Sequence, residues 1–366
     1  MDKQRLKDML KIVNLLLDYS NNAIIKDNFI KGFKNNTVNG RLYGRYNCFG
    51  AKTFRLTSNS PNLLNMPSTG SIYAKPIKRC FEAQQGYIFC MVDYGQLEDR
   101  VMANLSKDKN KCSLFLDGLD GHCLNSYYYF QKEIEDILPR NPDETLHNYI
   151  IKYKKAVDDG DSALKAIRSR SKRVTFGLSY GAMPKKVSQT IKCDLKTAEH
   201  IYNKYHNELY SDITKMRNEI LKIAKQQHRI HLGLGCYLYT DRPERDIRTL
   251  SNSVCQFWSI LTLLTIDKIN DLIKEKGFQK KIEVVSSIYD SIYFHVVEDP
   301  AIIHWLNTEL IPIMTKNFLI DTIVPNTAEL ECGYNWADTV AIPNNASIFD
   351  IKAIMQKAQN LFRQNV

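Results

Sequence analysis

Two aspartates stand where apolar segments end, which is where a protein often presents reactive side chains. Tyr87–Val92 is continuously apolar and predicts a buried strand, and Asp93 follows it directly. Asp290 lies inside VVSSIYDSIYFHVV, residues 284–297, which predicts two strands joined by a tight turn with this acid at the tip. A carboxylate in such surroundings costs several kcal/mol unless a cation, a donor or a metal compensates it.

If the two carboxylates converge, they repel each other unless cations lie between them. The hard cation that prefers oxygen ligands and phosphate is Mg²⁺. Two such ions, about 3.5–4 Å apart, can activate the attacking oxygen and stabilise the leaving oxygen in phosphoryl transfer. The alternative is that Asp93 and Asp290 are independent turn or capping residues, which are common at strand ends.

A second group of candidate residues recurs at intervals of four in IRSRSKRVTFGLSYGA: Arg168, Lys172, Phe176 and Tyr180. Four residues of helix turn about 400°, so each side chain advances only about 40° and the four form one winding stripe. Two cations followed by two aromatic rings could grip a triphosphate and pack against a base or sugar. The alternative is a helix with a basic exposed edge and an aromatic core edge.

A third group consists of dispersed amides and guanidiniums: Arg55, Asn62, Asn65, Arg248, Asn252 and Gln256. Minor-groove edges of every base pair present acceptors, so donors placed there can test the shape of a duplex without reading its sequence. Individually, each is better explained as an ordinary surface or capping residue. Together they indicate a duplex held by its groove.

Composition is consistent with a globular protein that binds a polyanion. The 366 residues suffice for one large or two to three modest domains, and the net charge of +10 suggests nucleic acid, although many basic proteins only have solvated basic faces. The nine cysteines form no C-x-x-C pair, which disfavours zinc and a disulfide framework. We find no apolar run of about 18 residues and no signal-peptide pattern, so we expect a cytoplasmic protein without a membrane partner.

The elements that must position these residues alternate between helix and strand. An amphipathic helix opens the chain, and a further helix is predicted from Gln96 by the spacing of Leu97, Val101 and Leu105. The charged segment 132–162 predicts a surface excursion. Helical spacing then dominates to about residue 228 and returns at 246–275, and strands are predicted at 283–297 and 328–333. The first helix carries one apolar face that needs a partner surface: Leu6, Met9, Leu10, Val13, Leu16 and Leu17.

Six segments together resemble the family A DNA polymerases, the bacterial DNA polymerase I type. TFRLTSNSPNLLNMP resembles the family's TGRLSSxxPNLQNIP, DYGQLEDRV its motif A DYSQIELRV, and RSRSKRVTFGLSYG its motif B RxxxKxxxFGxxYG. IYDSIYF resembles motif C VHDEIxx, GLDGHCLNS resembles GxDIHxxTA, and ELECGYNWAD resembles VEVGxGxxW. The six occur in the family's order across residues 38–338.

The resemblance implies an α/β fold of right-hand architecture, with an antiparallel palm sheet and a helical fingers subdomain but only a remnant of the thumb. The implied boundaries are thumb helices at 1–37, palm at 38–118, fingers at 119–235 with an insertion around 132–162, and palm again at 236–366. A separate chain could supply a thumb or an exonuclease.

The resemblance also implies roles for individual residues. Asp93 and Asp290 would hold two Mg²⁺ ions, and the deoxynucleoside triphosphate would be bound by His122, Arg168, Lys172, Phe176, Tyr180, Gln96 and Glu98. Within that set, Lys172 would also assist the pyrophosphate leaving group, Tyr180 would stack at the template position, and Glu98 would exclude ribonucleotides as a steric gate. Primer–template DNA would be contacted by Arg55, Asn62, Asn65, Arg248, Asn252 and Gln256.

Several positions depart from the family's motifs. Tyr289 and Ser291 replace the usual His and Glu of motif C, Gly95 and Asp99 alter motif A, and Phe54 replaces the Gly before Arg55, which affects the backbone there. Two rival interpretations are a single-subunit RNA polymerase, which Glu98 and Phe176 disfavour, and a non-catalytic or partner-dependent DNA-binding subunit of a split polymerase. The Lys-, Asn- and Ile-rich composition hints at an AT-rich genome such as that of a bacterial virus.

Overall fold

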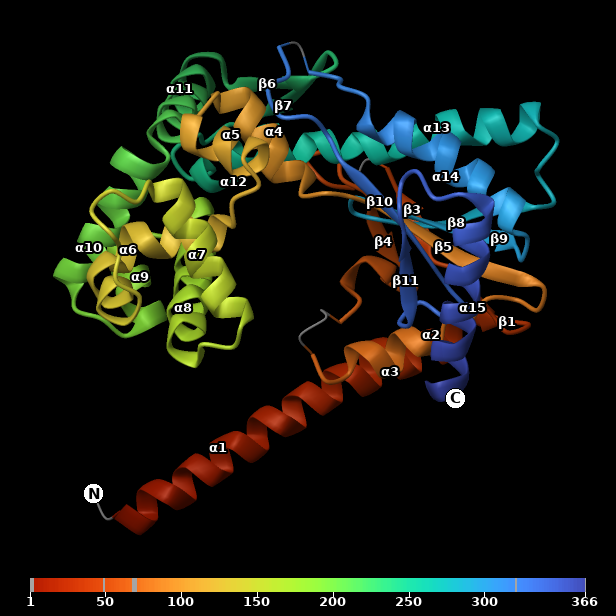
Figure 1. The fold of residues 1–366 in the computed structure, drawn as a ribbon, viewed down its shortest axis with the longest axis horizontal. Helices are drawn as coiled ribbons and strands as arrows, with labels where there is room; N and C mark the ends of the chain where they lie inside the picture. The colour runs from red at the N-terminus through yellow and green to blue at the C-terminus, as the bar shows by residue number, and fades with distance from the viewer. Residues whose placement is uncertain (1–2, 49, 68–70, 320, 366) are drawn as a thin grey trace. The chain divides into compact units, whose positions relative to one another are not determined.

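The computed structural model describes residues 3–48, 50–67, 71–319 and 321–365. The chain divides into two compact units. The sheet unit comprises Met1–Gly95, Ser259–Thr315 and Thr327–Val366, and the helical unit comprises Gln96–Trp258 and Lys316–Asn326. Figure 1 labels the α-helices and most of the strands of both units. The fold is mixed α/β, mostly helical with an antiparallel sheet, as predicted.

The sheet unit is built on five strands in the order β11-β10-β5-β9-β8, and each neighbouring pair is antiparallel. The central strand, β5, spans Tyr87–Tyr94. Its neighbours are β9 (Ser291–Val297) and β10 (Ala328–Gly333), and the edges are β8 (Ile282–Ile288) and β11 (Thr339–Ile342). The strands predicted at 87–92, 283–297 and 328–333 are therefore confirmed.

Side chains of β5 alternate between the two faces of this sheet. Ile88, Cys90 and Val92 are fully buried, as expected of a strand whose apolar side lies in the core. Helices α13 (Ile260–Glu275), α14 (Pro300–Thr315) and α15 (Ile348–Asn365) pack against the sheet. On the other face, Met91 packs against a cluster of Leu64, Ile288, Tyr293 and Trp336. The strand that ends in Asp93 is thus fixed from both sides.

Short elements of the early chain complete the sheet unit. The helix predicted at the start is α1 (Lys3–Ile24), which continues through the π-helix η1 (Ile25–Lys31) into α2 (Gly32–Asn36). The hairpin of β1 (Thr37–Val38) and β2 (Arg41–Leu42) follows. After it come β3 (Arg45–Asn47), β4 (Thr57–Asn59), the 3-10 helix η2 (Leu63–Asn65) and α3 (Ala74–Arg79).

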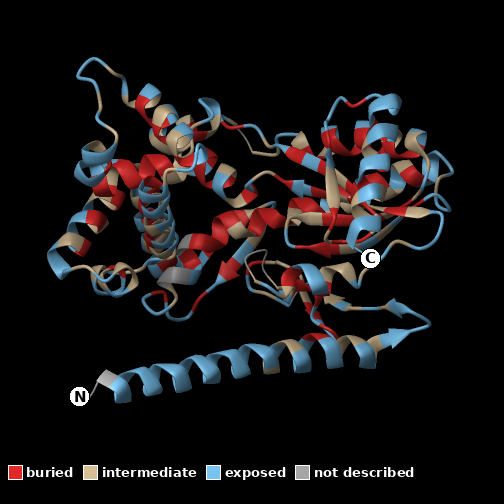
Figure 2. Cartoon of the chain, turned by 60° about the horizontal axis from the view of Figure 1, so that its bottom comes forward, coloured by how far each residue is buried: buried red, intermediate tan, exposed pale blue. Residues whose placement is uncertain are grey.

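The apolar face predicted for helix α1 is exposed to solvent, as Figure 2 shows, and the side chain of Leu16 is 62% exposed.

The helical unit begins with α4 (Leu97–Ser106), α5 (Lys109–Leu116) and α6 (Gly121–Ile137). It continues with α7 (Leu146–Asp158), α8 (Ser162–Ser179), α9 (Pro184–Ile191), α10 (Leu195–Asn203) and the π-helix η3 (Lys204–Leu209). After α11 (Ser211–Gln227) comes the hairpin of β6 (Arg229–Gly233) and β7 (Cys236–Tyr239), and then α12 (Ile247–Gln256) and the 3-10 helix η4 (Phe257–Ser259). None of the helices in the described ranges is long and apolar enough to cross a membrane.

The predicted surface excursion at 132–162 is wrong in one respect, because this segment contributes to the core. It contains α7, on which Tyr149, Ile150 and Tyr153 are fully buried. The hydroxyl of Tyr149 donates to the carbonyl of Leu138 at 2.6 Å, so the buried tyrosine hydroxyl has a hydrogen-bond partner. The spacing of these residues places them on one helical face, and the many charges occupy the other. That the segment is an insertion, and the subdomain boundaries around it, stay predictions.

Candidate active site

The pairing of β5 with β9 brings the two aspartates together. Asp93 lies opposite Ser291 in this pairing, and Asp290 immediately precedes Ser291. The backbone N–H of Tyr94 also donates to the carbonyl of Asp290 at 3.3 Å. Ile288 pairs with Ser291, so Tyr289 and Asp290 form the two-residue turn that the sequence predicts. Two acids separated by almost 200 positions in the chain therefore occupy adjacent places at one end of the sheet.

Strand β10 adds further negative charge beside Asp93. Glu329 lies directly opposite Asp93, and Glu331 lies opposite Met91, so both glutamates share the face of Asp93. Displacement of water by the surrounding chain raises the pKa of Asp93, and repulsion from Glu331 and Glu329 raises it further. The hydroxyl of Ser291 donates to the Asp93 carboxylate at 2.7 Å and opposes this shift. Sequence reasoning missed the two glutamates, although their i, i+2 spacing in a predicted strand places them on one face.

The donor set suits a hard divalent cation. The side chains of Ser291, Glu329 and Glu331 beside Asp93 all offer oxygen atoms as ligands. The negative charge of the carboxylates favours a cation there. Within the described ranges, no cluster of three or more His, Cys, Asp or Glu side chains could enclose a metal ion by itself. Mg²⁺ commonly keeps several waters and is held by one or two carboxylates together with substrate phosphates, so a carboxylate pair is a sufficient protein contribution.

Two backbone positions beside the sheet-unit site adopt the left-handed conformation that glycine favours. Phe54 has φ +62°, and Tyr289 has φ +53°. Such positions cost on the order of 1–3 kcal/mol for residues other than glycine and cluster at functional sites. The motif that this segment resembles has Gly at the position of Phe54. The residue type therefore differs from the motif, but the backbone has the left-handed conformation that glycine favours. Each strained position directly precedes a predicted site residue, Arg55 or Asp290.

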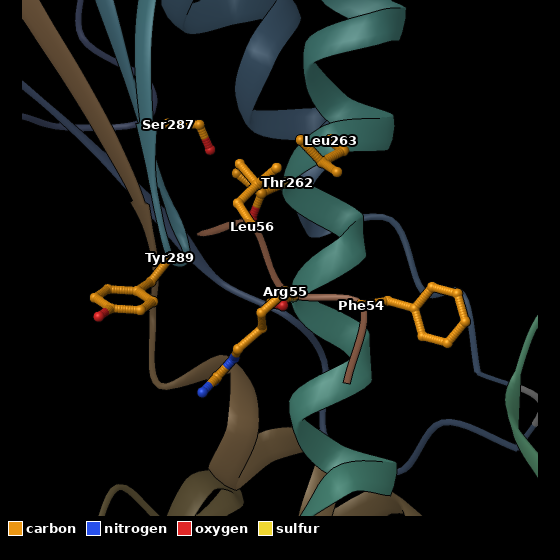
Figure 3. A pocket seen from close by; sticks show the side chains of 8 residues that line it. Phe54, Arg55, Leu56, Thr262, Leu263, Ser287 and Tyr289 are labelled. Atoms are coloured by element: carbon orange, nitrogen blue, oxygen red, sulfur yellow. The ribbon is translucent and has the colours of Figure 1, made fainter. Parts of the chain in front are cut away.

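A small pocket of the sheet unit is lined by residues of both of these strained turns. It is lined by Phe54, Arg55, Leu56, Ser259, Thr262, Leu263, Ser287 and Tyr289. Figure 3 shows Arg55 and Tyr289 extending to the same side while Phe54 points away. The guanidinium carbon of Arg55 lies 6.0 Å from the centre of the Tyr289 ring. Arg55 therefore lies beside the turn that carries Asp290.

The remaining predicted DNA contacts of the sheet unit lie on η2. Asn62 caps this short helix, because its side-chain oxygen accepts from the N–H of Leu64 at 3.0 Å. Asn65 is the last residue of η2, and both asparagines are exposed. Asn62 therefore serves as the capping residue that the alternative interpretation described.

In the helical unit, Arg168, Lys172 and Phe176 all lie on α8 as the spacing predicts, and Tyr180 caps its C-terminal end. The rings of Phe176 and Tyr180 are 4.9 Å apart. Phe176 is 66% exposed, so its ring does not belong to an aromatic core edge. Apolar residues on other sides of α8 are buried, including Leu164, Val174 and Leu178. The stripe is therefore presented outward from a helix whose opposite side is anchored.

Arg168 has a fixed partner that the sequence did not reveal. Its Nη2 and Nε atoms donate to the two carboxylate oxygens of Asp120 at 2.6 Å and 3.1 Å. Asp120 also caps α6 by accepting from the N–H of Cys123 at 2.8 Å. Burial raises the pKa of Asp120, but these donors more than offset it and the pKa is lowered. An aspartate in the capping position directly before Gly121 was the available signal, but no helix was predicted there.

His122 follows Asp120 at the start of α6. Burial lowers its pKa, the positive charges of Arg168 and Lys172 lower it further, and Asp120 opposes the change. Its Nδ1 atom is buried, and no hydrogen-bond partner for it lies within the described residues. These effects favour the neutral imidazole of His122, which lies close to the cations of the stripe. The structure thus brings Arg168, Lys172 and His122 together.

The polar residues of α12 and the start of α4 are placed differently. Asn252 is only 5% exposed, and its side-chain oxygen accepts from Nη2 of Arg217 at 3.2 Å. Gln256 is half-buried, and the side chain of Arg248 lies outside the described residues. Gln96 is exposed at φ +55° and caps α4, which carries the half-buried Glu98 in its first turn. DNA contacts by the α12 residues stay predictions.

Comparison with known proteins identifies the family. Residues 1–338 match the family described as DNA polymerase family A, and the chain belongs to that family. It is 24% identical over 355 residues to DNA polymerase I of Caldicellulosiruptor bescii, covering 92% of this chain and 37% of the relative. It is 23% identical to DNA polymerase I of Chloroflexus aurantiacus, covering 91% of this chain and 33% of the relative. The chain therefore spans about a third of the length of these relatives.

The fold is also similar to a solved structure, that of the POL domain of Pol1 from M. smegmatis in complex with DNA primer-template and dNTP. The TM-score is 0.72 at 20% sequence identity, and the match covers 92% of this chain and 56% of that chain. This similarity confirms the predicted fold class. The family match confirms the resemblance carried by the six sequence segments.

Proposed function

We propose that this chain is a template-directed DNA polymerase core that adds deoxynucleotides to the 3' end of a primer. The observation that carries the proposal is the β5–β9 pairing, which places Asp290 beside Asp93. Membership of DNA polymerase family A supports it. A similarly folded protein has been solved with primer–template DNA and dNTP, which supports these as the substrates.

In this proposal Asp93 and Asp290 hold two Mg²⁺ ions. Bound there, the ions would lower the cost of the negative charge that develops on the attacking and leaving oxygens. The part played by the chain itself is to keep the carboxylates in place. Ser291 holds one oxygen of Asp93 by its hydrogen bond, and the sheet pairing fixes the backbone of both acids.

The stripe on α8 would bind the incoming nucleotide. Arg168 and Lys172 supply positive charge for the triphosphate, with His122 beside them, and Lys172 would assist the departing pyrophosphate. Because Asp120 already fixes the guanidinium of Arg168, little side-chain freedom is lost when phosphates bind. The exposed ring of Phe176 would pack on the sugar and base, Tyr180 would stack at the template position, and Glu98 with Gln96 would border the sugar.

Primer–template DNA would be contacted by the exposed Asn62 and Asn65, by Arg55, and by the α12 residues Arg248, Asn252 and Gln256. Whether the chain acts alone or with a separate chain that supplies further subdomains is part of what the experiment below decides. Its setting, in replication or repair within a bacterial or phage-infected cell, stays a prediction.

The test compares the purified wild type with Asp93→Asn and Asp290→Asn on a short primer–template in Mg²⁺ and deoxynucleotides. Each substitution removes one proposed metal-binding charge, from the exposed Asp93 or from the half-buried Asp290. We therefore expect nucleotide addition to be lost while affinity for the duplex is retained. Glu283→Gln, an exposed acid on the same sheet, is the matched control and should stay active. A fully active Asp290→Asn variant would show that Asp290 is not part of the metal site. A wild type that binds the duplex without extending it would favour a partner-dependent subunit.

A further inference from the structure

The β6–β7 hairpin of the helical unit has one face committed to the core. Ile230, Leu232 and Leu238 are each no more than 4% exposed, and β6 packs against α11 and α12. Gly233, at φ +139°, lies so close to Trp258 that an added Cβ would stand 2.9 Å from its ring. This close approach requires glycine and fixes the hairpin against the aromatic pair of Phe257 and Trp258. The hairpin, labelled in Figure 1, is thus anchored without help from its other face.

The opposite face presents two aromatic rings and two nitrogen-bearing side chains to solvent. Arg229 pairs with Tyr239, and His231 pairs with Tyr237, so all four point to the same side. Arg229 and His231 are exposed, Tyr237 is 40% exposed, and Tyr239 is 66% exposed. We call these four residues the hairpin face.

Contacts within the hairpin face hold the ring of Tyr237 in a fixed orientation. The guanidinium carbon of Arg229 lies 4.7 Å from the centre of this ring. The ring of His231 lies 5.1 Å from it on the neighbouring strand. Aromatic side chains that are already ordered lose little freedom when a ligand binds. The surface on which a flat ligand would stack is therefore preorganised.

The charge around the hairpin face favours an anionic ligand. Residues 228–240, which form the hairpin and its ends, contain no acidic side chain. Arg229 supplies a positive charge on this face, and helix α11, which leads directly into β6, carries Lys222 and Lys225 beside a separate open hollow of the same unit. Stacking rings with nearby cations are what single-stranded nucleic acid binds, since every base has a flat face and every linkage a negative charge.

We propose that the hairpin face is a binding site for unpaired nucleotides of single-stranded DNA, such as the 5' overhang of a template. This proposal rests on the proposed function for the identity of the polymer, but its geometry is independent of the acids. The bases would stack on Tyr237 and Tyr239, and Arg229 would meet the backbone phosphates. A protein partner is disfavoured because the face comprises only four residues and carries the positive charge of Arg229.

The test measures equilibrium binding of fluorescent DNA without nucleotide or Mg²⁺. Three probes share one sequence: a blunt duplex, the same duplex with an unpaired 5' template extension, and a single-stranded oligonucleotide. For Tyr239→Ala, and for Tyr237→Ala with Tyr239→Ala, we expect the extension and single-strand probes to bind at least about fivefold more weakly per ring removed. The blunt duplex should bind as it does to the wild type.

Two matched variants separate stacking from folding. Tyr237→Phe keeps the ring and should bind like the wild type, and Phe349→Ala removes a ring that is 80% exposed on α15 and should also have no effect. Equal weakening for all three probes, or no weakening, would overturn the proposal. This assay measures DNA binding without catalysis, so it tests the hairpin face even if the chain fails to extend primers. If the double variant does not fold, the binding of Tyr239→Ala alone still decides the proposal.

Discussion

At the residue scale, the active site depends on how the carboxylate of Asp93 is held. The family's motif C usually carries Glu after its aspartate, whereas this chain has Ser291. The serine hydroxyl donates to Asp93 at 2.7 Å, which an ionised glutamate could not do. It also avoids another negative charge on a face that already carries Glu329 and Glu331. The departure therefore replaces an acid with a donor.

Removing that donor should weaken metal binding. For Ser291→Ala we expect a rise of roughly fivefold to tenfold in the Mg²⁺ concentration that gives half-maximal extension, since hydrogen bonds to charged groups are worth about 1.5–3 kcal/mol and solvent partly replaces this one. Mn²⁺ binding followed by electron paramagnetic resonance should show the same shift without any catalysis. Ser291→Thr keeps the hydroxyl on a strand and should restore wild-type binding. An unchanged midpoint in both assays would show that Ser291 does not position Asp93.

A second residue-scale prediction concerns sugar selection. Glu98 is half-buried in the first turn of α4. If it lies over the 2' carbon of the bound sugar, Glu98→Ala should increase the efficiency of ribonucleotide addition relative to deoxynucleotide addition by about tenfold or more. The measurement is the ratio of kcat/KM for the two sugars. Asp99→Ala, one position further along the same turn, is the control, and an unchanged ratio in Glu98→Ala would place the steric gate elsewhere.

Sequence reasoning proposed residues for the candidate site but did not find the residues that support them. Asp93, Asp290 and the α8 stripe were found from local pattern, because strand ends and helical spacing are visible in short windows. Asp120 and the two glutamates of β10 act through long-range pairing, which no short window contains. Asn252 was predicted as a groove contact, and its burial against Arg217 was not foreseen, because burial depends on which helix packs on which.

At the element scale, the end of α8 is held from inside the helical unit. Arg217 of α11 is buried and donates from Nη2 to the carbonyl of Ser179 at 2.7 Å and to Asn252 at 3.2 Å. A positive charge at the C-terminal end of a helix is favourable, because the last carbonyls carry partial negative charge. This contact fixes the helix end at which Tyr180 lies.

Breaking the contact should loosen the last turn of α8. For Arg217→Met we expect amide hydrogen exchange in a peptide covering residues 174–182 to quicken by about tenfold, since a lost buried hydrogen bond costs roughly 1–3 kcal/mol. Exchange in α7 should stay unchanged. Arg173→Met changes an exposed arginine on α8 and is the control. Equal exchange in the two variants would show that Arg217 does not anchor the helix.

The elements themselves were largely predictable from the sequence. The three predicted strand regions, the turn at Asp290, the helix from Gln96, and the helical segments after residue 162 and at 246–275 follow from apolar periodicity and are confirmed. The α7 segment was misjudged because its charges and prolines dominate its composition, whereas three buried residues on one helical face decide its place. Strand order was not accessible, because β5 pairs with β9 and β10, which follow it by roughly 200 residues.

At the scale of the whole molecule, the net charge of +10 bears on DNA binding. If several phosphates are neutralised, affinity for primer–template should fall by at least about tenfold between 50 and 200 mM salt. Fluorescence anisotropy across this range measures the slope. Asp290→Asn should show the same slope as the wild type if Asp290 binds the metal ions, as proposed, and not the phosphates of the DNA. An affinity independent of salt would show that the basic charge is only a solvated surface.

The most direct test of the central claim is template-directed choice of nucleotide. The purified chain is given one deoxynucleotide at a time on four primer–templates that differ only in the first templating base. The account predicts Mg²⁺-dependent extension only where nucleotide and templating base are complementary, and none with Asp93→Asn. Extension that ignores the templating base, or equal extension by Asp93→Asn, would contradict it.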